Sequence, residues 1–206
     1  LIAFGCSLTF GQYLDKNVYI NDVDKPSYKS WPYVLSNLLD ISTCINISKP
    51  GISNKQIAYN VLNFDFEEND LVFVLYTHLN RHCIIGLDKI KLVNTWFTDS
   101  TSTNYYKYFY NSHDNIFENY LYFNQVENFF RIKNIKNINM IISSQYIKNM
   151  DTPKWSSISW LNIFFDGLAK YYPKAFDNQH PGVEAHNKFA VKIKETFLTK
   201  NYIKYI

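Results

Sequence analysis

An almost continuous apolar run, Leu71 to Tyr76, constrains the fold of this chain more than any other stretch. A strand that is apolar on both faces is typical of the centre of a parallel sheet, where helices cover both sides. Shorter apolar stretches at Leu1 to Phe4, Thr43 to Ile47 and Ile138 to Ile142 predict three further strands. The chain therefore carries the strands of a small parallel sheet.

Helical patterns fall between these strands, and their alternation predicts right-handed crossovers in an α/β protein. The expected helices begin at Trp31 with Ser30 as N-cap, run from Ser53 or Asn54 to about Asn63, from Asp114 or Asn115 to Ile132, and from Val183 to about Thr199. We also expect a helical stretch within 155–172 and a polar loop at 99–104. No repeat or linker divides the 206 residues, so one domain is expected.

Composition limits the classes of function. A hydrophobic content of 47% with 19% charged residues describes a folded soluble protein. The net charge of +3 is not gathered in runs, so no nucleic-acid partner is expected. No apolar run approaches the roughly 18 residues that a membrane span requires, so no membrane span is expected.

The three cysteines, Cys6, Cys44 and Cys83, are scattered along the chain. This arrangement fits neither a disulfide framework nor a zinc site, and free thiols are typical of a reducing compartment. A cytoplasmic or virion-associated protein is therefore favoured. Because the chain opens at Leu1 with a strand already under way, we expect residues to precede it, and these can include a removed signal peptide.

Ser7 directly follows the first predicted strand, in the stretch Gly5-Cys6-Ser7. Gly5 allows a tight turn because it has no Cβ. Ligands gather at the carboxyl ends of strands in open α/β sheets, which makes Ser7 a candidate nucleophile. By itself, the pattern favours an ordinary strand-to-loop turn.

Asp177 and His180 form a second motif, D-x-x-H-P, near the other end of the chain. A serine hydroxyl is a weak nucleophile and needs a general base, usually a histidine, whose tautomer a third group fixes. An aspartate three residues before a histidine can meet it across one turn of backbone. Taken alone, the motif is that of a helix-capping aspartate and a surface histidine, but together with Ser7 it favours a Ser-His-Asp triad.

The order of these motifs resembles the SGNH/GDSL hydrolase superfamily over nearly the whole chain. The matching blocks are Gly5-Cys6-Ser7-Leu8-Thr9, Gly51 in SKPGISNKQ, Thr77-His78-Leu79-Asn80-Arg81, and Asp177 to His180. The cysteine before the serine, SWPYVL near residue 31 and HPGVEAHNKFA at the end are similar to small bacterial and phage-encoded members.

The resemblance implies a flavodoxin-like three-layer α/β/α sandwich with a central, mainly parallel sheet, formed by a single domain of residues 1–206. It implies a serine esterase that uses Ser7, His180 and Asp177 and needs no metal or cofactor. The implied substrate is a small-molecule or glycan ester that loses a small acyl group such as acetyl. We expect an aromatic-rich insertion or cap around 84–134 to set specificity, although most aromatics at helical spacing belong to cores.

Acyl transfer also requires donors for the developing oxyanion. The resemblance implies the backbone N–H groups of Ser7 and Gly51, and an asparagine side chain after the third strand. Asn80 stands one place later than the family's asparagine. A local shift would bring Asn80 in, or Thr77 or Arg81 would serve instead; otherwise Asn80 is an ordinary loop residue.

Rival residues compete for two of these roles. Cys6 is a stronger nucleophile in kind, but side chains alternate at a strand end, so we expect it to point away from its neighbour and to be packed. His186 competes with His180 as base, but it falls inside the last predicted helix without an aspartate three residues earlier. His78, His82 and His113 lack a partner pattern: a histidine near residue 80 is a candidate to line the cleft, but solvated loop residues are expected.

Two functions other than ester hydrolysis stay open. The misfit at Asn80 favours a catalytically impaired binding or virion-structural module with the same fold. The same triad would also serve an O-acyltransferase whose acceptor is a sugar or peptide hydroxyl. A phosphate-binding loop is a poor match, because GCSLTFG lacks the Gly-Lys-Ser/Thr ending of such loops.

Overall fold

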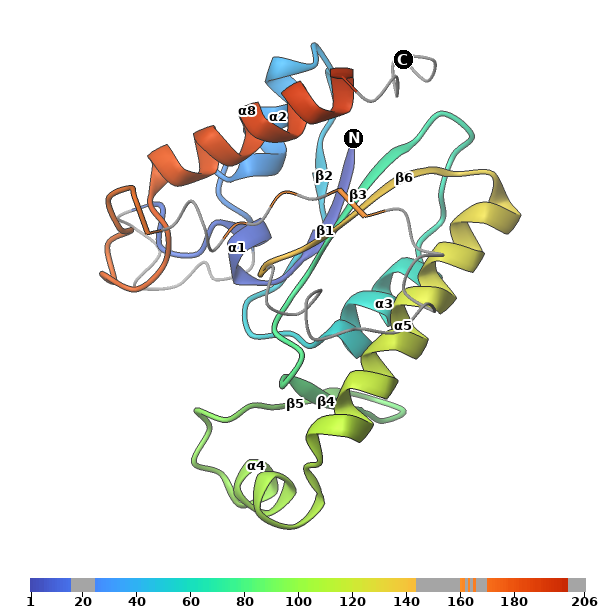
Figure 1. Cartoon of the computed structure of the whole chain (residues 1–206), viewed down its shortest axis with the longest axis vertical. Helices are drawn as coiled ribbons and strands as arrows, with labels where there is room; N and C mark the ends of the chain where they lie inside the picture. The colour runs from blue at the N-terminus through green and yellow to red at the C-terminus, as the bar shows by residue number, and fades with distance from the viewer. Residues whose placement is uncertain (16–24, 144–159, 162, 164, 166–169, 200–206) are drawn as a thin grey trace.

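The structure is a computed structural model of the chain (Figure 1), and it describes residues 1–15, 25–143, 160, 161, 163, 165 and 170–199. Its strands are β1 (Ile2–Gly5), β2 (Ile45–Asn46), β3 (Leu71–Tyr76), β4 (His82–Ile85), β5 (Ile90–Val93) and β6 (Lys136–Ile141). Its helices are α1 (Ser7–Phe10), α2 (Trp31–Leu38), α3 (Asn54–Leu62), α4 (Ser100–Asn104), the π-helical turn η2 (Tyr105–Phe109), α5 (Ser112–Lys133) and α8 (Val183–Thr199).

The central sheet has the strand order β2-β1-β3-β6, and every neighbouring pair is parallel. β3 lies between β1 and β6, and Val72 to Tyr76 are buried, as the apolar run at this position predicts. Next to β6, Trp160 forms an isolated parallel bridge with Asn139. The predicted parallel sheet is confirmed.

Helices cover both faces of this sheet (Figure 1): α2 and α8 pack on one side, and α3 and α5 on the other. Because strand side chains alternate, each strand feeds both layers. In β3, Phe73 and Leu75 join the core under α2 and α8, whereas Val72 and Val74 join the core under α3 and α5. The three-layer α/β/α sandwich is therefore confirmed.

Local signals fix several helix ends. Ser53 caps α3 by accepting the Gln56 N–H at 3.3 Å, as expected. Ser30 stands at the N-cap of α2, with a proline in the first turn. The expected polar loop at 99–104 is wrong: Asp99 accepts the N–H groups of Thr101 and Ser102 and starts α4.

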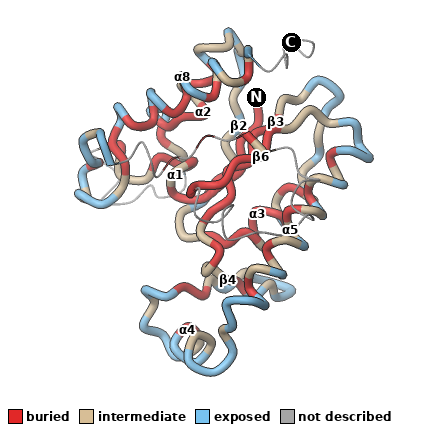
Figure 2. The backbone as a smooth tube through the Cα atoms, in the orientation of Figure 1, coloured by how far each residue is buried: buried red, intermediate tan, exposed pale blue. Residues whose placement is uncertain are grey.

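The segment from β4 to η2 lies at one end of the molecule, away from the central sheet (Figure 1), and much of its surface is exposed (Figure 2). β4 and β5 form a separate antiparallel pair. The expected insertion at 84–134 has two parts. Its first part belongs to this protruding segment, whereas its second part, in α5, packs on the central sheet. Most of the helical stretch expected within 155–172 lies outside the described residues. In the described part of the chain, no helix is long and apolar enough to cross a membrane.

Candidate active site

Ser7 stands at the carboxyl end of β1, at the first position of the short helix α1. Only 4% of the residue's surface is exposed. Its N–H has no acceptor within the helix, because the first N–H groups of any helix lack one. Gly11 ends α1 in a left-handed conformation with φ of 75°. The turn thus presents both the hydroxyl and the N–H of Ser7 at the edge of the sheet.

Gly5 is required here by a close approach. A Cβ at this position would overlap Thr9 Oγ1 and would lie 3.1 Å from the Leu75 carbonyl oxygen of β3. The Thr9 side chain folds back over the end of the strand, so α1 sits tightly on β1. The space that Gly5 leaves therefore helps to fix where Ser7 lies.

Asp177 and His180 form a closed dyad in the loop that precedes α8. Asp177 Oδ2 lies 2.6 Å from His180 Nδ1, and Asp177 Oδ1 accepts the N–H groups of Gln179 and His180, both at 3.0 Å. The loop is tied across its base by a bond from the Ala175 N–H to the His180 carbonyl at 2.8 Å. Burial raises the pKa of Asp177, but these hydrogen bonds outweigh it and leave the pKa below the ordinary value.

A cavity of about 1030 Å³ brings the two ends of the chain together. Ser7, Gly51 and His180 line it. Its apolar wall includes Leu92 and the rings of Tyr13, Trp96 and Phe97. The sequence-based pairing of Ser7 with the D-x-x-H motif therefore corresponds to a shared cavity.

The hydroxyl of Ser7 does not bond to the imidazole in this structure. Its hydrogen-bond partner is Cys6 Sγ, at 4.0 Å, and within the described residues Ser7 Oγ makes no hydrogen bond to His180. Catalytic hydrogen bonds are often long or poorly aligned in free enzymes and tighten when substrate binds. The ring of Tyr13 packs against His180, with the two ring centroids 5.3 Å apart.

Gly51 lines the cavity with its backbone in the left-handed region, at φ of 76°. An added Cβ would meet nothing nearer than Leu92 Cδ1 at 3.5 Å, so the conformation, not crowding, is what requires glycine. The Asn94 amide holds the Gly51 carbonyl at 3.0 Å. This turn leaves the Gly51 backbone open to the cavity.

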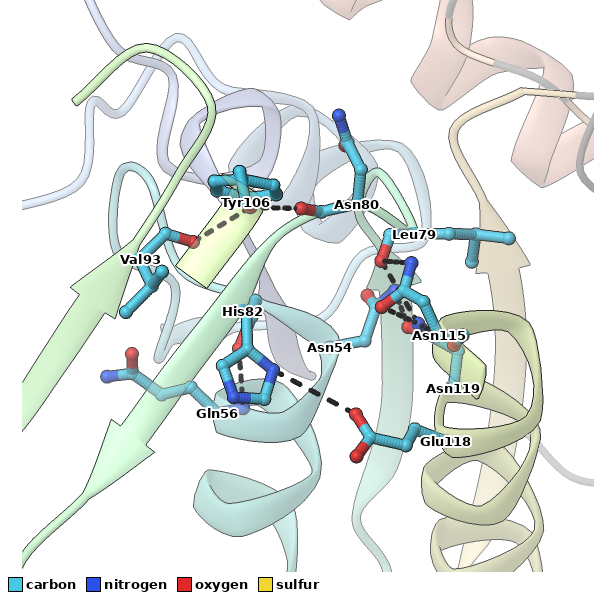
Figure 3. Close-up of polar contacts among 11 residues, drawn as sticks. Asn54, Gln56, Leu79, Asn80, His82, Val93, Tyr106, Asn115, Glu118 and Asn119 are labelled. Carbon is cyan, nitrogen blue, oxygen red and sulfur yellow. Dashed lines mark hydrogen bonds and ion pairs between the residues drawn. The ribbon is translucent and has the colours of Figure 1, made fainter. Parts of the chain in front are cut away.

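Three asparagine side chains brace the loop that follows β3 (Figure 3). Asn54 accepts the Thr77 N–H at 2.7 Å and donates to the Thr77 carbonyl at 3.2 Å and to Asn119 Oδ1 at 2.7 Å. Asn115 and Asn119 both donate to the Leu79 carbonyl, at 2.5 and 3.1 Å. The loop is therefore fixed from α3 and from α5.

Two of the predicted oxyanion residues in this loop do not line the cavity. Thr77 is fully buried, and its hydroxyl has no hydrogen-bond partner. The Asn80 amide points away from the asparagine network (Figure 3). The backbone carbonyl of Asn80 accepts the Tyr106 hydroxyl, which also donates to the Val93 carbonyl at 3.1 Å. The loop turns so that its next residue, Arg81, reaches the cavity instead.

Arg81 and His78 both line the cavity. The Arg81 guanidinium lies over the Trp96 ring, 4.8 Å from its centroid. Burial, and secondarily the charge of Arg81, lowers the pKa of His78 to about 4, so this imidazole is neutral near pH 7. The expectation of a solvated His78 is wrong, because the braced loop turns it inward.

The rival residues are placed as follows. Cys6 is buried in the core under α3 and α5, as expected, but it does not point away from Ser7, since α1 begins there and strand alternation ends. His186 lies inside α8, fully buried, where Nδ1 accepts the Trp31 N–H at 3.2 Å. It is a core residue. Among the described residues, no group of three or more His, Cys, Asp or Glu side chains forms a metal-binding cluster.

Comparison with solved structures identifies the fold. The chain is similar to TesA, with a TM-score of 0.59 and 13% identity over 95% of this chain and 96% of that one. It is also similar to a member of the lipolytic protein G-D-S-L family from Veillonella parvula (TM-score 0.51, 14% identity, 96% and 97% covered). A psychrotrophic esterase, EstA from Pseudoalteromonas sp., matches with a TM-score of 0.54 and 12% identity over 97% of both chains.

The chain has the SGNH/GDSL hydrolase fold. No protein-family model and no curated protein matches the sequence. At identities of 12 to 14%, the likeness establishes the SGNH/GDSL fold and leaves the activity to the site itself. The fold expected from the four sequence blocks is thus confirmed.

Two groups of site residues were not anticipated from the sequence. The bracing asparagines sit on helices, where the pattern marks only apolar faces. Tyr13 comes from a segment without helical or strand periodicity, whereas Trp96 belongs to the aromatic-rich insertion that was expected from the sequence to set specificity. The sequence did mark the position of Asn54, because this residue follows the Gly51 block and begins a predicted helix. An asparagine at a helix start is usually interpreted as an N-cap, so its bracing role was not predicted.

Proposed function

We propose that this protein is a serine ester hydrolase that uses Ser7 as nucleophile, His180 as general base and Asp177 to orient the base. The observation that carries the proposal is that Ser7 and His180 line one cavity, with His180 hydrogen-bonded to Asp177 behind it. The shared fold with lipolytic proteins and esterases supports the same class of reaction.

The steps follow from the chemistry of these groups. Asp177 accepts the Nδ1–H of His180, which leaves Nε2 free to take the Ser7 proton as Oγ attacks the ester carbonyl. The N–H groups of Ser7 and Gly51 stabilise the oxyanion of the tetrahedral intermediate. His180 then returns the proton to the leaving alcohol, and water repeats the sequence on the acyl-enzyme to release the acid.

The substrate that we propose is an ester of a small acyl group such as acetyl on a glycan or a similar carrier. A cavity of about 1030 Å³ has room for a sugar-sized leaving group beside the acyl group. Aromatic rings such as Trp96 can stack on a sugar face.

The test is hydrolysis of a neutral chromogenic acetate ester by four variants. Ser7→Ala and His180→Ala should each lower kcat/KM on the order of 10³-fold or more, since either change removes the triad's action. Ser112→Ala and His113→Ala, matched changes at exposed positions at the start of α5, should leave kcat/KM unchanged. Turnover that survives in Ser7→Ala would contradict the mechanism.

A binding module with the same fold is the second candidate, and the position of Asn80 favours it. With that amide outside the cavity, one oxyanion donor expected from the family is missing, and loss of such a donor costs roughly 10²–10³ in rate. Complete lack of Ser7-dependent turnover, with carbohydrate binding retained, would support this candidate over the hydrolase.

A further inference from the structure

Arg81 presents a charge at the cavity wall that nothing described in the protein neutralises. Its side chain lines the cavity that contains Ser7 and His180. Nε and Nη1 are buried and have no hydrogen-bond partner. Within the described residues no carboxylate pairs with this guanidinium. A buried cation without a counter-charge is unfavourable, so such a group is usually kept for an anion that arrives from outside.

The guanidinium is held in place before any ligand binds. Its central carbon, Cζ, lies over the Trp96 ring at 4.8 Å from the centroid, an arrangement that is favourable for a cation on an aromatic ring. Its backbone N–H bonds to the His78 carbonyl at 3.3 Å, inside the loop that Asn54, Asn115 and Asn119 brace. A fixed guanidinium loses little conformational freedom on binding, which favours affinity.

The other charged residues that line the cavity are also positive. Lys170 and Lys174 also line it, and no Asp or Glu stands among its described lining residues. Asp177 lies behind His180 and is occupied by it. Charges of one sign around a concave site raise the local concentration of ligands of the opposite sign.

We propose that Arg81 binds an anionic oxygen group, such as a carboxylate, on the ester, so that the preferred substrates are negatively charged. This inference rests on the proposed hydrolase function and adds the charge of the substrate. Arg81 then binds a charged group of the substrate, whereas the N–H groups of Ser7 and Gly51 stabilise the oxyanion of the intermediate. Arginine suits this task because its planar fork can donate two parallel hydrogen bonds to one carboxylate.

Two pairs of esters test the inference and locate the anion. The first pair, 4-acetoxybenzoate and its methyl ester, differs by a charge on the leaving alcohol. The second, the 4-nitrophenyl esters of succinic acid (hemiester) and of butyric acid, differs by a charge on the acyl group. For at least one pair, kcat/KM should favour the anionic ester about tenfold or more, the size expected for a hydrogen bond to a charged group.

Arg81→Gln should remove about tenfold or more of this preference, and Arg81→Lys should restore part of it. Arg131→Gln is the matched control, because Arg131 is exposed on α5, away from the cavity, and its guanidinium donates to Asn128. Circular dichroism should confirm that each variant is folded. Equal losses on the charged and neutral esters in Arg81→Gln would overturn the inference, since they would mean an oxyanion or structural role.

A binding measurement separates this inference from the hydrolase proposal. The Ser7→Ala protein should bind 4-hydroxybenzoate or succinate in calorimetry, and the Ser7→Ala/Arg81→Gln protein should bind the same anion about tenfold more weakly or not at all. Anion binding without any Ser7-dependent turnover would contradict the hydrolase proposal alone. Turnover without charge preference, and with no Arg81-dependent binding, would contradict the anion site alone.

Discussion

His180 and His186 have opposite environments although they belong to the same stretch of chain. His180 is partly exposed at a cavity and bonds to a carboxylate. His186 is fully buried in α8, with Phe165 against its ring at a centroid distance of 5.0 Å. Burial, and secondarily the charge of His180, lowers the pKa of His186 to about 3. His186 is thus held neutral in the folded protein, whereas His180 is accessible from the cavity.

The buried imidazole should make the protein sensitive to acid. At pH values between the lowered pKa of about 3 and the ordinary value of 6.5, His186 is protonated in the unfolded state but neutral in the folded state. The free energy of unfolding should therefore fall as the pH drops below about 6.5, by up to about 1.4 kcal/mol per pH unit for this group. His186→Gln should lower stability at pH 7.5 but reduce this slope.

Urea unfolding of both proteins from pH 7.5 to pH 4 measures the difference. His78 and His82, whose pKa values burial lowers to about 4, act in the same direction but are present in both proteins and cancel. Identical slopes would show that the His186 ring does not stay neutral in the folded protein.

At the level of single residues, the sequence predicted the contacts between residues that are close together in the chain. Asp177 and His180 contact each other across three residues, so their spacing alone indicated the pair. Asn80 could not be placed in this way. Its orientation depends on which carbonyls of its loop are held by α3, α5 and Tyr106, and these are contacts between segments far apart in sequence.

Among the elements, the loop after β3 is the one whose shape matters most to the site. Asn54, at the start of α3, holds both backbone polar groups of Thr77 and the side chain of Asn119. All of these groups are buried. Their hydrogen bonds are what turn His78 and Arg81 toward the cavity.

Asn54→Ala should lower the free energy of unfolding by about 2 to 4 kcal/mol, because it leaves several buried groups without partners. Asn63→Ala is the control: Asn63 makes one exposed hydrogen bond at the end of the same helix, and its loss should cost about 1 kcal/mol or less. Chemical denaturation of the three proteins measures these values. Similar small losses in both variants would mean that the network around Thr77 does not hold the loop.

Elements with a strong apolar pattern were predicted well, and those without one were not. The apolar run gave β3 its correct bounds, and the steps of four in Ala185, Phe189, Ile193 and Phe197 gave α8. α4 consists of Ser, Thr and Asn residues and has no apolar stripe. It depends on the Asp99 side chain, a signal that is equally common at the start of a turn.

For the whole molecule, two apolar layers hold the sandwich together and join the early and late parts of the chain. Trp31 of α2 packs against Phe189 of α8, with ring centroids 5.6 Å apart, and Phe189 also contacts Phe165 at 4.5 Å. This layer fixes α8 on the sheet, directly after the loop that carries Asp177 and His180. The layers were predictable because periodicity reports burial, whereas the cavity wall formed by Tyr13, Trp96 and Arg81 depends on how irregular segments meet.

Phe189→Ala should destabilise the protein by about 3 to 5 kcal/mol, as expected for an aromatic side chain removed from a full core. Phe117→Ala is the matched control, since Phe117 on α5 is 59% exposed and its change should cost about 0.5 kcal/mol or less. Thermal or urea unfolding distinguishes them. Equal effects would mean that the contact between α2 and α8 contributes little to stability.

The bond between Asp177 and His180 has a consequence for how this fold can diverge. Because residues three positions apart make it, an insertion or deletion elsewhere in the chain leaves the carboxylate and the imidazole aligned and alters only their separation from Ser7. The segment from β4 to η2 contributes a wall of the cavity and neither member of this pair. Changes in the size of the cavity can therefore accumulate in that segment while the contact between Asp177 and His180 is preserved.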